Sequence, residues 1–299
     1  MPTAVIYALT VLIWGSTWIM IKYQLGVVPQ EVSLVYRFSI AAVALAMFAL
    51  AQRRRIKIPL KQLPSVALQG VFMFSANYYF VYHGTAFIAS GLVAVLFTSL
   101  VIMNALNERL FFGTRIAATT IIAGSLSLVG VAMMFWPEIS ALSMSDDAVK
   151  GFALVLIGAY MASLGNMAAL VNTRRALPVV AVNMTGMAFG AACSAVFALA
   201  TAKPFVMDWQ FDYIASLLFL AIPGTALAFG LYLKLMERIG ATKSAYTTVM
   251  LPVVALLIST VFEDYQWSAL AVLGLVIALT GNAMALTAKA SPAPVSRTS

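Results

Sequence analysis

The sequence predicts an all-α integral membrane protein with ten transmembrane helices arranged as two inverted five-helix repeats. Composition is the first reason: 63% of the 299 residues are hydrophobic and only 9% are charged, against about 25% charged in ordinary globular domains. Apolar runs are the second reason, because stretches of roughly 18 residues recur along the chain and each can cross a hydrocarbon core about 30 Å thick. A repeated sequence pattern is the third.

The repeated pattern is a hydrophobic hairpin. Its first copy runs from about Phe72 to Arg109 and closes on Glu108-Arg109. About 152 positions further on, a second copy begins with Gly230-Leu231-Tyr232-Leu233-Lys234 and closes on Glu263-Asp264. A duplicated hairpin is typical of transporters built from internal repeats. The alternative is that all Leu- and Ala-rich spans resemble one another.

Turn residues and charges divide the chain into spans. The expected spans are 3–22, 31–51, 64–83, 89–107, 114–135, 149–172, 178–201, 211–237, 242–262 and 266–288. Residues 1–137 form the first repeat, 138–148 an external linker, 149–290 the second repeat and 291–299 a disordered cytoplasmic tail. The first span is expected to be an uncleaved helix, since the N-terminus lacks the charged region and cleavage site of a signal peptide.

Lys and Arg predict the orientation. Most of the 18 basic residues fall in one set of alternate loops, whereas the other set holds only Lys22, Lys150 and Lys203. The positive-inside rule therefore places both termini in the cytoplasm, and the protein is expected to be multi-pass in the bacterial cytoplasmic (inner) membrane. Because each half has an odd number of spans, the second half is inverted, with a substrate cavity near the midplane. The basic excess is topological and does not indicate nucleic-acid binding.

Polar and aromatic residues inside the expected spans are the candidate site, since such groups are costly in a membrane. In the third span Tyr78 and Tyr82 share a helix face, and a cavity lined in this way suits a flat, partly polar solute. An aromatic belt at the outer interface is the alternative for Tyr82 and His83. The candidate substrate-binding residues are Trp14, Trp18, Asn77, Tyr78, Tyr82, Phe97, Ser99, Tyr160, Asn166, Tyr246 and Met250.

Candidate hinges are Gly15, Pro223, Gly224 and Pro252, since Pro removes a backbone hydrogen bond and bends a helix. Neither Pro has a counterpart in the first half, so flexing is expected mainly in the second; a static kink is the alternative. Gly15 can equally serve close helix packing.

Several chemistries are not expected. All ten acidic residues fall in loops or at span ends, which argues against a proton-coupled exporter of organic cations. Arg37, inside the second span, is expected to pair with helix carbonyls or a tyrosine rather than with substrate. One His and one Cys cannot form a metal cluster or a catalytic triad, and there is no nucleotide-binding loop. The chain is therefore expected to be no enzyme, to need no cofactor and to use no ATP. His83 is the residual candidate for proton linkage.

Several motifs resemble the EamA family of the drug/metabolite transporter superfamily. The stretch from Trp14 to Lys22 resembles its first-span signature, Arg37-Phe38 its second-span Arg-Phe, and Glu108-Arg109 with the stretch from Ala123 to Gly130 the end of its repeat. The resemblance covers essentially the whole chain. This sequence departs from the family in a shortened fourth span, in Ala123 where Gly is usual, and in Glu263-Asp264 where Glu-Arg is frequent.

The whole chain is similar to the YddG-type exporters of that family, and the resemblance implies export of aromatic amino acids and related solutes. The carrier is expected to be a monomer that works by alternating access. Broad export of drugs or other amino acids is one alternative. A membrane scaffold without transport is another.

Overall fold

The computed structural model describes the chain except residues 25, 89, 141–145, 263–266 and 288–299. The tail at 291–299 and Glu263-Asp264 lie outside the described residues. Every regular element in the described part is helical. Among the described residues, seven helices or continuous helical runs are long and apolar enough to cross a membrane, and two shorter apolar helices cover Thr3–Thr17 and Ala118–Met134. The prediction of an all-helical membrane protein is confirmed.

The first 140 residues form ten helical elements. They are α1 (Thr3–Lys22), α2 (Gln30–Ala51), η1 (Leu60–Gln62), α3 (Leu63–Val71), η2 (Phe72–Ala76), α4 (Asn77–Thr85), α5 (Ser90–Phe97), α6 (Leu100–Phe112), α7 (Ala118–Met134) and α8 (Trp136–Ser140). α3 has Pro64 in its first turn, where a missing N–H costs nothing. α6 ends on Gly113 at φ +67°, and the Gly113 N–H donates to the Arg109 carbonyl. This left-handed cap stops the helix just after Glu108-Arg109.

The remaining helices begin at Asp146, inside the expected linker. They are α9 (Asp146–Arg174), α10 (Val179–Ala200), α11 (Phe211–Ala221), η3 (Ile222–Leu227), α12 (Ala228–Ile239), α13 (Ala241–Ala245), α14 (Thr247–Phe262) and α15 (Ala269–Thr287). The residue before α10 is Pro178, which favours the extended backbone found there. α3, η2 and α4 follow one another without a gap, as do α11, η3 and α12.

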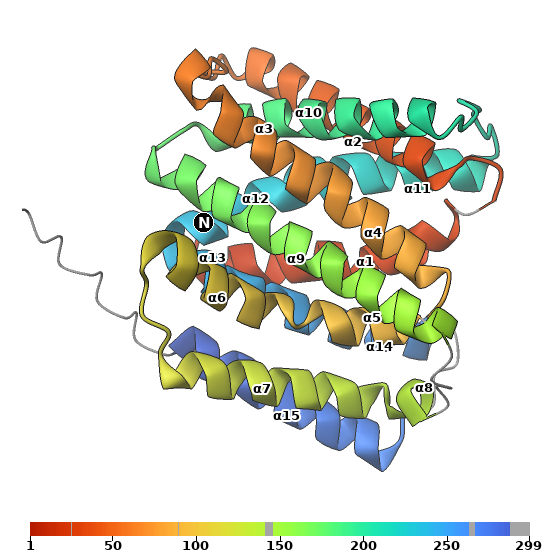
Figure 1. Cartoon of the computed structure of the whole chain (residues 1–299), viewed down its shortest axis with the longest axis vertical. Coiled ribbons are helices and arrows are strands. Elements are labelled where there is room, and N and C mark those ends of the chain that lie inside the picture. The colour runs from red at the N-terminus through yellow and green to blue at the C-terminus, as the bar shows by residue number, and fades with distance from the viewer. Residues whose placement is uncertain (25, 89, 141–145, 263–266, 288–299) are drawn as a thin grey trace, which may run out of the picture.

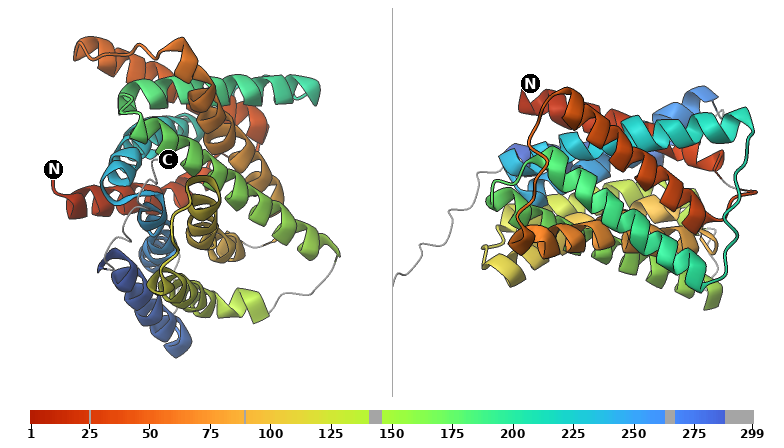
Figure 2. Two further views of the ribbon diagram at one scale, coloured as in Figure 1. Left: turned by 60° about the vertical axis from the view of Figure 1, so that its left-hand side comes forward. Right: turned by 90° about the horizontal axis from the view of Figure 1, so that it is seen from above.

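The helices lie side by side with their axes running in roughly one direction (Figure 1). One edge of the bundle is formed by α2 and α10, and the opposite edge by α7 and α15; a second view shows the same two pairs (Figure 2). Each pair takes one helix from residues 1–137 and one from 149–290. The α7–α15 pair packs through glycine, since a Cβ added at Gly130 would lie 2.4 Å from the Ala278 nitrogen. Close approach through small residues is characteristic of membrane helices.

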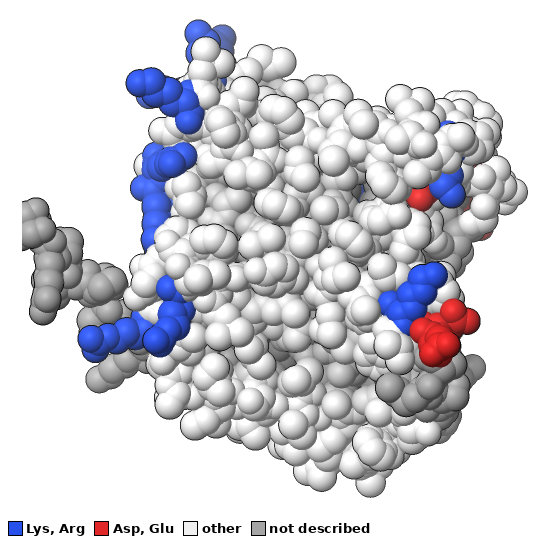
Figure 3. Space-filling view, in the orientation of Figure 1, with Lys and Arg blue, Asp and Glu red and all other residues white. Residues whose placement is uncertain are grey.

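Charges separate to the two ends of the bundle. Most of the Lys and Arg in the space-filling view lie along one edge, the Asp and Glu lie at the other edge with a few Lys or Arg beside them, and the band between is almost free of charge (Figure 3). α9 spans this distance, because it begins with Asp146-Asp147 and ends at Arg174. We call these the acidic end and the basic end.

Irregular helical turns occur at matching places in both halves. η2 and η3 are π-helical turns, in which the i→i−4 hydrogen bonds are interrupted. η2 starts at Phe72 and η3 at Ile222, 150 positions later. Similarly, a turn at Thr98-Ser99 separates α5 from α6, and a turn at Tyr246 separates α13 from α14. Backbone irregularity is therefore present in both halves, although η3 is the one of these four turns that contains a Pro.

Candidate functional site

A continuous series of aromatic side chains crosses the middle of the bundle. We call it the aromatic row: Trp14, Phe38, Phe74, Tyr78, Tyr82, Phe229 and Tyr232. α1, α2, η2 and α4 supply five of its rings, and α12 supplies Phe229 and Tyr232. The row thus joins residues that lie 155 to 218 positions apart in the chain and belong to the two expected repeats.

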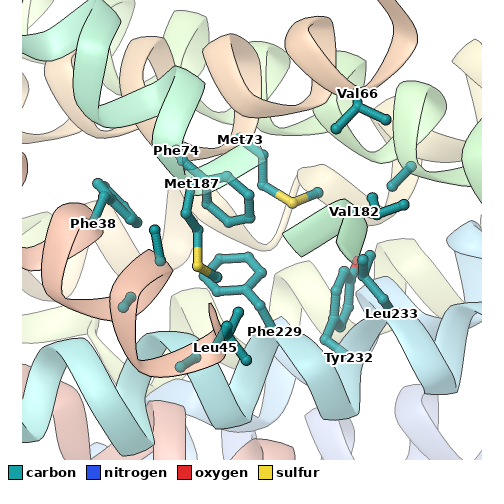
Figure 4. Packing of buried hydrophobic residues seen from close by; sticks show 14 of the residues in the cluster. Phe38, Leu45, Val66, Met73, Phe74, Val182, Met187, Phe229, Tyr232 and Leu233 are labelled. Atoms are coloured by element: carbon teal, nitrogen blue, oxygen red, sulfur yellow. The ribbon is translucent and has the colours of Figure 1, made fainter. Parts of the chain in front are cut away.

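Trp14 and Phe74 meet the second half of the chain at Phe229. The Trp14 ring centroid lies 4.9 Å from that of Phe229 and 5.1 Å from that of Tyr232. Phe229 in turn lies 4.8 Å from Phe74, at an interplanar angle of 84°. The rings of Phe74 and Phe229 are adjacent, with Met187 alongside (Figure 4). These distances are those of favourable edge-to-face pairs.

The row continues towards the acidic end through α2 and α4. Phe74 lies 5.5 Å from Phe38, Phe38 lies 5.3 Å from Tyr78, and Tyr78 lies 6.3 Å from Tyr82. Tyr78 and Tyr82 are four residues apart on α4, so the helix itself places them on one face.

A buried cation lies beside this part of the row. Arg37 is only 4% exposed, and its guanidinium carbon is 5.1 Å from the Tyr78 ring centroid and 5.7 Å from that of Phe38. Its Nε donates a hydrogen bond of 2.8 Å to Thr225 Oγ1. Thr225 Oγ1 donates to the Leu220 carbonyl, which the π-helical turn η3 leaves available. The expected pairing with a tyrosine is thus present, through the ring of Tyr78 and the nearby hydroxyl of Tyr82, and Nε bonds the Thr225 hydroxyl in addition.

Trp14 also binds the irregular turn. Its indole Nε1 donates to the Gly224 carbonyl at 3.1 Å. A π-helical turn leaves carbonyls without their usual partners, and buried carbonyls need one. Trp14 and Arg37, from two helices of the first half, therefore both hold η3.

A polar seam lies between the aromatic row and the basic end. Asn166 Nδ2 donates to Asn104 Oδ1 at 3.4 Å, and Asn107 Nδ2 donates to Ser163 Oγ at 2.9 Å, so these bonds join α6 to α9. Nearer the basic end, Glu108 accepts hydrogen bonds from the Thr242 N–H at 2.6 Å and from its hydroxyl at 2.8 Å. α6 is thereby attached to α13 in the other half of the chain.

His83 and Glu31 meet near the acidic end. His83 Nε2 lies 3.6 Å from Glu31 Oε1, and Glu31 is 6% exposed. His83 Nδ1 lies 2.9 Å from the Tyr79 carbonyl, which can only accept, so Nδ1 carries the hydrogen of that bond. Nε2 then attracts the carboxylate only when a further proton is held between the two groups.

The structure brings some of the expected site residues together and not others. Trp14, Tyr78 and Tyr82 lie in the aromatic row, and Asn166 lies in the polar seam. Asn77 is buried at the start of α4, and its Oδ1 has no hydrogen-bond partner in the described part of the chain. The side chain of Trp18 lies outside the described residues.

Other expected site residues lie elsewhere. Tyr160 is 40% exposed on α9, apart from the row. Tyr246 is 1% exposed, and its hydroxyl donates to the Thr120 carbonyl near α7. Phe97 and Met250 pack against a separate apolar cluster that includes Val101 and Val249. The remaining one, Ser99, donates to the Leu96 carbonyl of the preceding turn.

The expected hinge residues occupy different surroundings. Pro223 and Gly224 lie in η3, and Pro252 lies inside α14. Gly15 is a contact point between α1 and α14, since an added Cβ would lie 2.4 Å from Val254 Cγ1. The surroundings of Gly15 thus favour the close-packing interpretation.

Sequence reasoning did not select several members of the row. Phe38, Phe74, Phe229 and Tyr232 were not candidates, and Arg37 was assigned a structural role. Tyr232 stood in the repeated pattern at Gly230–Lys234, and Phe229 lies three residues before it on the same helix. Helical spacing of aromatic residues on α12 was the available signal.

Apolar helices packed through glycines, with surface charges gathered at the bundle ends, define a multi-pass integral membrane protein. The EamA-like transporter family model matches residues 2–136 and 149–287. The chain belongs to this family, whose members are transporters and not enzymes.

Curated relatives are similar over most of the chain. A probable amino-acid metabolite efflux pump of Escherichia coli is 23% identical over 93% of this chain and 92% of its own length. The uncharacterized transporter YoaV of Bacillus subtilis is 23% identical over 82% of this chain and 83% of its own. A solved structure with a TM-score of 0.76 and 16% identity covers 95% of this chain and 96% of that one, which shows the shared fold.

Proposed function

We propose that this protein exports aromatic amino acids and related small metabolites across a bacterial cytoplasmic membrane. In this proposal ten spans form two inverted five-helix repeats, and a monomer works by alternating access along a path between them. The observation that carries the proposal is the aromatic row, in which rings from both halves meet across the centre of the bundle.

The repeat arrangement has support from matched positions. The family model matches the chain twice, at 2–136 and 149–287. α2 and α10 each have 22 residues and start at Gln30 and Val179, 149 positions apart. The breaks in α3–α4 and α11–α12 are likewise matched, and broken helices near the midplane are where such transporters bind substrate.

Orientation follows from the separated charges. With the basic end inside, both termini are cytoplasmic, and Lys and Arg obey the positive-inside rule. Substrate would then enter from the basic end, past the Glu108–Thr242 contact, and leave at the acidic end.

The chemistry of the row supports the substrate class. Stacked aromatic rings offer large apolar contact surfaces to a flat solute, and the amides of the polar seam can satisfy its polar groups. The E. coli relative described as a probable amino-acid metabolite efflux pump supports amino-acid export as the activity.

Flux from proteoliposomes loaded with labelled Phe, Trp, Thr or Met tests the proposal. We expect Phe and Trp to leave faster than Thr and Met. Equal flux of all four would instead support a broad-specificity exporter, and flux of none would support a scaffold.

Tyr78→Ala should impair flux without lowering expression. Tyr160→Ala is the matched control, since Tyr160 is exposed on α9. Normal flux in Tyr78→Ala would exclude the row as the path.

A further inference from the structure

Arg37 is a charged side chain held deep in an apolar helix. It lies seven residues after Gln30, the start of α2, which corresponds to about 10 Å along the helix axis. A basic side chain at this depth can extend to the interface, but Arg37 does not: its Nε is bound to Thr225 and the residue is 4% exposed.

The guanidinium keeps unused hydrogen-bonding capacity. Nε is bound to Thr225 and the Tyr82 hydroxyl lies within hydrogen-bonding reach of the guanidinium, whereas Nη1 is buried with no partner among the described residues. No described Asp or Glu forms an ion pair with Arg37. The nearby Glu31 on the same helix pairs with His83 instead.

These contacts do not compensate the positive charge. An unpaired ion in a low-dielectric interior carries a large desolvation penalty, and the cation–π contacts with Tyr78 and Phe38 recover only part of it. An arginine in this state is suited to bind an anion through the donors that the protein leaves free.

We propose that Arg37 binds the carboxylate of the transported solute, with Nη1 as a donor. This inference rests on the proposed function and names the part of the substrate that the site recognises. A ligand whose carboxylate meets Arg37 can lay its ring against Tyr78 and Phe38, which lie against the same guanidinium. A single cation suits a monoanion such as a carboxylate, whereas a phosphate would call for several cations.

Three ligands that share a phenyl ring distinguish carboxylate binding at Arg37 from general binding of aromatic molecules. They are 3-phenylpropionate, its neutral amide 3-phenylpropanamide, and phenethylamine, each titrated against the purified protein in detergent. We expect wild type to bind the acid at least tenfold more tightly than the amide, a difference of about 1.4 kcal/mol. Phenethylamine should bind most weakly, because it brings a second cation to Arg37. Equal affinity of the wild-type protein for the acid and the amide would by itself overturn the inference.

Variants assign the discrimination to Arg37. Arg37→Gln should abolish the preference for the acid, and Arg37→Lys should keep part of it, since a compact ammonium lacks the planar donor pair. Arg54→Gln is the matched control: Arg54 also lies over a ring, at 5.3 Å from the Phe48 centroid, but is exposed. Unchanged acid preference in folded Arg37→Gln would overturn the inference. If Arg37→Gln does not fold, the acid-to-amide ratio of wild type still decides.

The two proposals can fail separately. Labelled Phe flux with acid preference retained in Arg37→Gln would leave the export proposal standing and reject Arg37 as the carboxylate site. If Phe is not exported but 3-phenylpropionate binds in an Arg37-dependent way, the carboxylate site stands and the export proposal is rejected. If none of the three ligands binds, Arg37 is rejected as the carboxylate site, and Phe flux alone decides the export proposal.

Discussion

At the scale of single residues, several buried polar groups of this protein are satisfied by helices of the other half. Trp14 donates to Gly224, Arg37 to Thr225 and Asn104 to the Ala241 carbonyl. Unsatisfied polar groups are expensive away from water, so these bonds also fix how the halves meet. Where a donor remains free, as at Arg37 Nη1, a solute is the available partner.

The Tyr78 ring gives the first residue-scale prediction. Its π-face contacts Arg37 and its edge contacts Phe38, whereas no hydrogen bond of its hydroxyl is among those described. Tyr78→Phe should therefore keep flux within about twofold. Tyr78→Leu removes ring contacts worth about 1–2 kcal/mol, so apparent affinity should fall roughly 5- to 30-fold. Concentration-dependent flux measures both, with Tyr160→Leu as the exposed control. If Tyr78→Phe and Tyr78→Leu lose similar amounts of apparent affinity, the Tyr78 hydroxyl and not its ring contributes to substrate binding.

Trp14 and Tyr160 show what the sequence could predict about the site. Trp14 and Tyr78 were selected as aromatic residues deep in apolar spans, and the structure places both in the aromatic row. Tyr160, another candidate, lies 146 positions after Trp14. In the structure matched helices start 149 to 151 positions apart, as Gln30 and Val179 or Ala118 and Ala269 do. An error of a few residues rotates a helical side chain to another face.

At the scale of helices, the irregular turns could not be predicted in full. Pro223 marked η3, because a missing N–H interrupts the helix. η2 has no Pro within Phe72–Ala76, and its π-helical turn has no local sequence signal. It depends on packing against α9 and α10, where Met73 and Phe74 contact Gly165 and Gly190. Such tertiary contacts are not visible in a single sequence.

Thr225 and Pro223 test what maintains η3. Thr225 bonds both Leu220 and Arg37, so its loss frees two buried polar groups, each worth about 1–3 kcal/mol. Thr225→Val should lower thermal stability and flux, while Pro223→Ala should change both little because η2 forms without Pro. Melting curves in detergent with parallel flux assays give the comparison. If Pro223→Ala lowers thermal stability and flux more than Thr225→Val does, Pro223 is the cause of the π-helical turn η3.

Glycines give a prediction about helix packing. A Cβ at Gly70 would lie 2.2 Å from the Gly186 carbonyl oxygen, a backbone atom that cannot move aside without shifting α10. Gly70→Ala should therefore reduce the yield of folded protein and lower the melting temperature, by a cost of about 1–3 kcal/mol. Gly230→Ala is the control, since no atom lies within 4 Å of its added Cβ. Size-exclusion profiles and melting curves compare them; equal behaviour would mean that α3 and α10 are not tightly packed.

At the scale of the whole molecule, the halves are joined differently at the two ends. Near the acidic end Gln24 Nε2 donates to the Tyr213 carbonyl at 3.0 Å and Ser33 lies 2.9 Å from the Tyr213 hydroxyl, so α11 is held by α2 and by the residues after α1. Near the basic end the contacts are Asn104 to the Ala241 carbonyl and Glu108 to Thr242. Alternating access requires that contacts at one end break while those at the other persist.

Glu108 is the charged member of the contacts at the basic end, so its removal should favour opening there. Its carboxylate accepts both the N–H and the hydroxyl of Thr242, and hydrogen bonds to a charged group contribute about 1.5–3 kcal/mol each. Glu108→Gln weakens both. If opening requires them to break, the open population should rise roughly tenfold.

A cysteine placed just inside this contact measures that population. Ser244 on α13 is fully buried and differs from Cys by one atom, so Ser244→Cys in a Cys193→Ser background is a conservative reporter. A membrane-impermeant thiol reagent applied from the basic end should modify it roughly tenfold faster when Glu108→Gln is added. Gln24→Ala, which weakens contacts at the acidic end, should slow the same reaction or leave it unchanged. If Glu108→Gln does not raise the rate, α6 and α13 remain closed without the carboxylate, and entry past Glu108 is excluded.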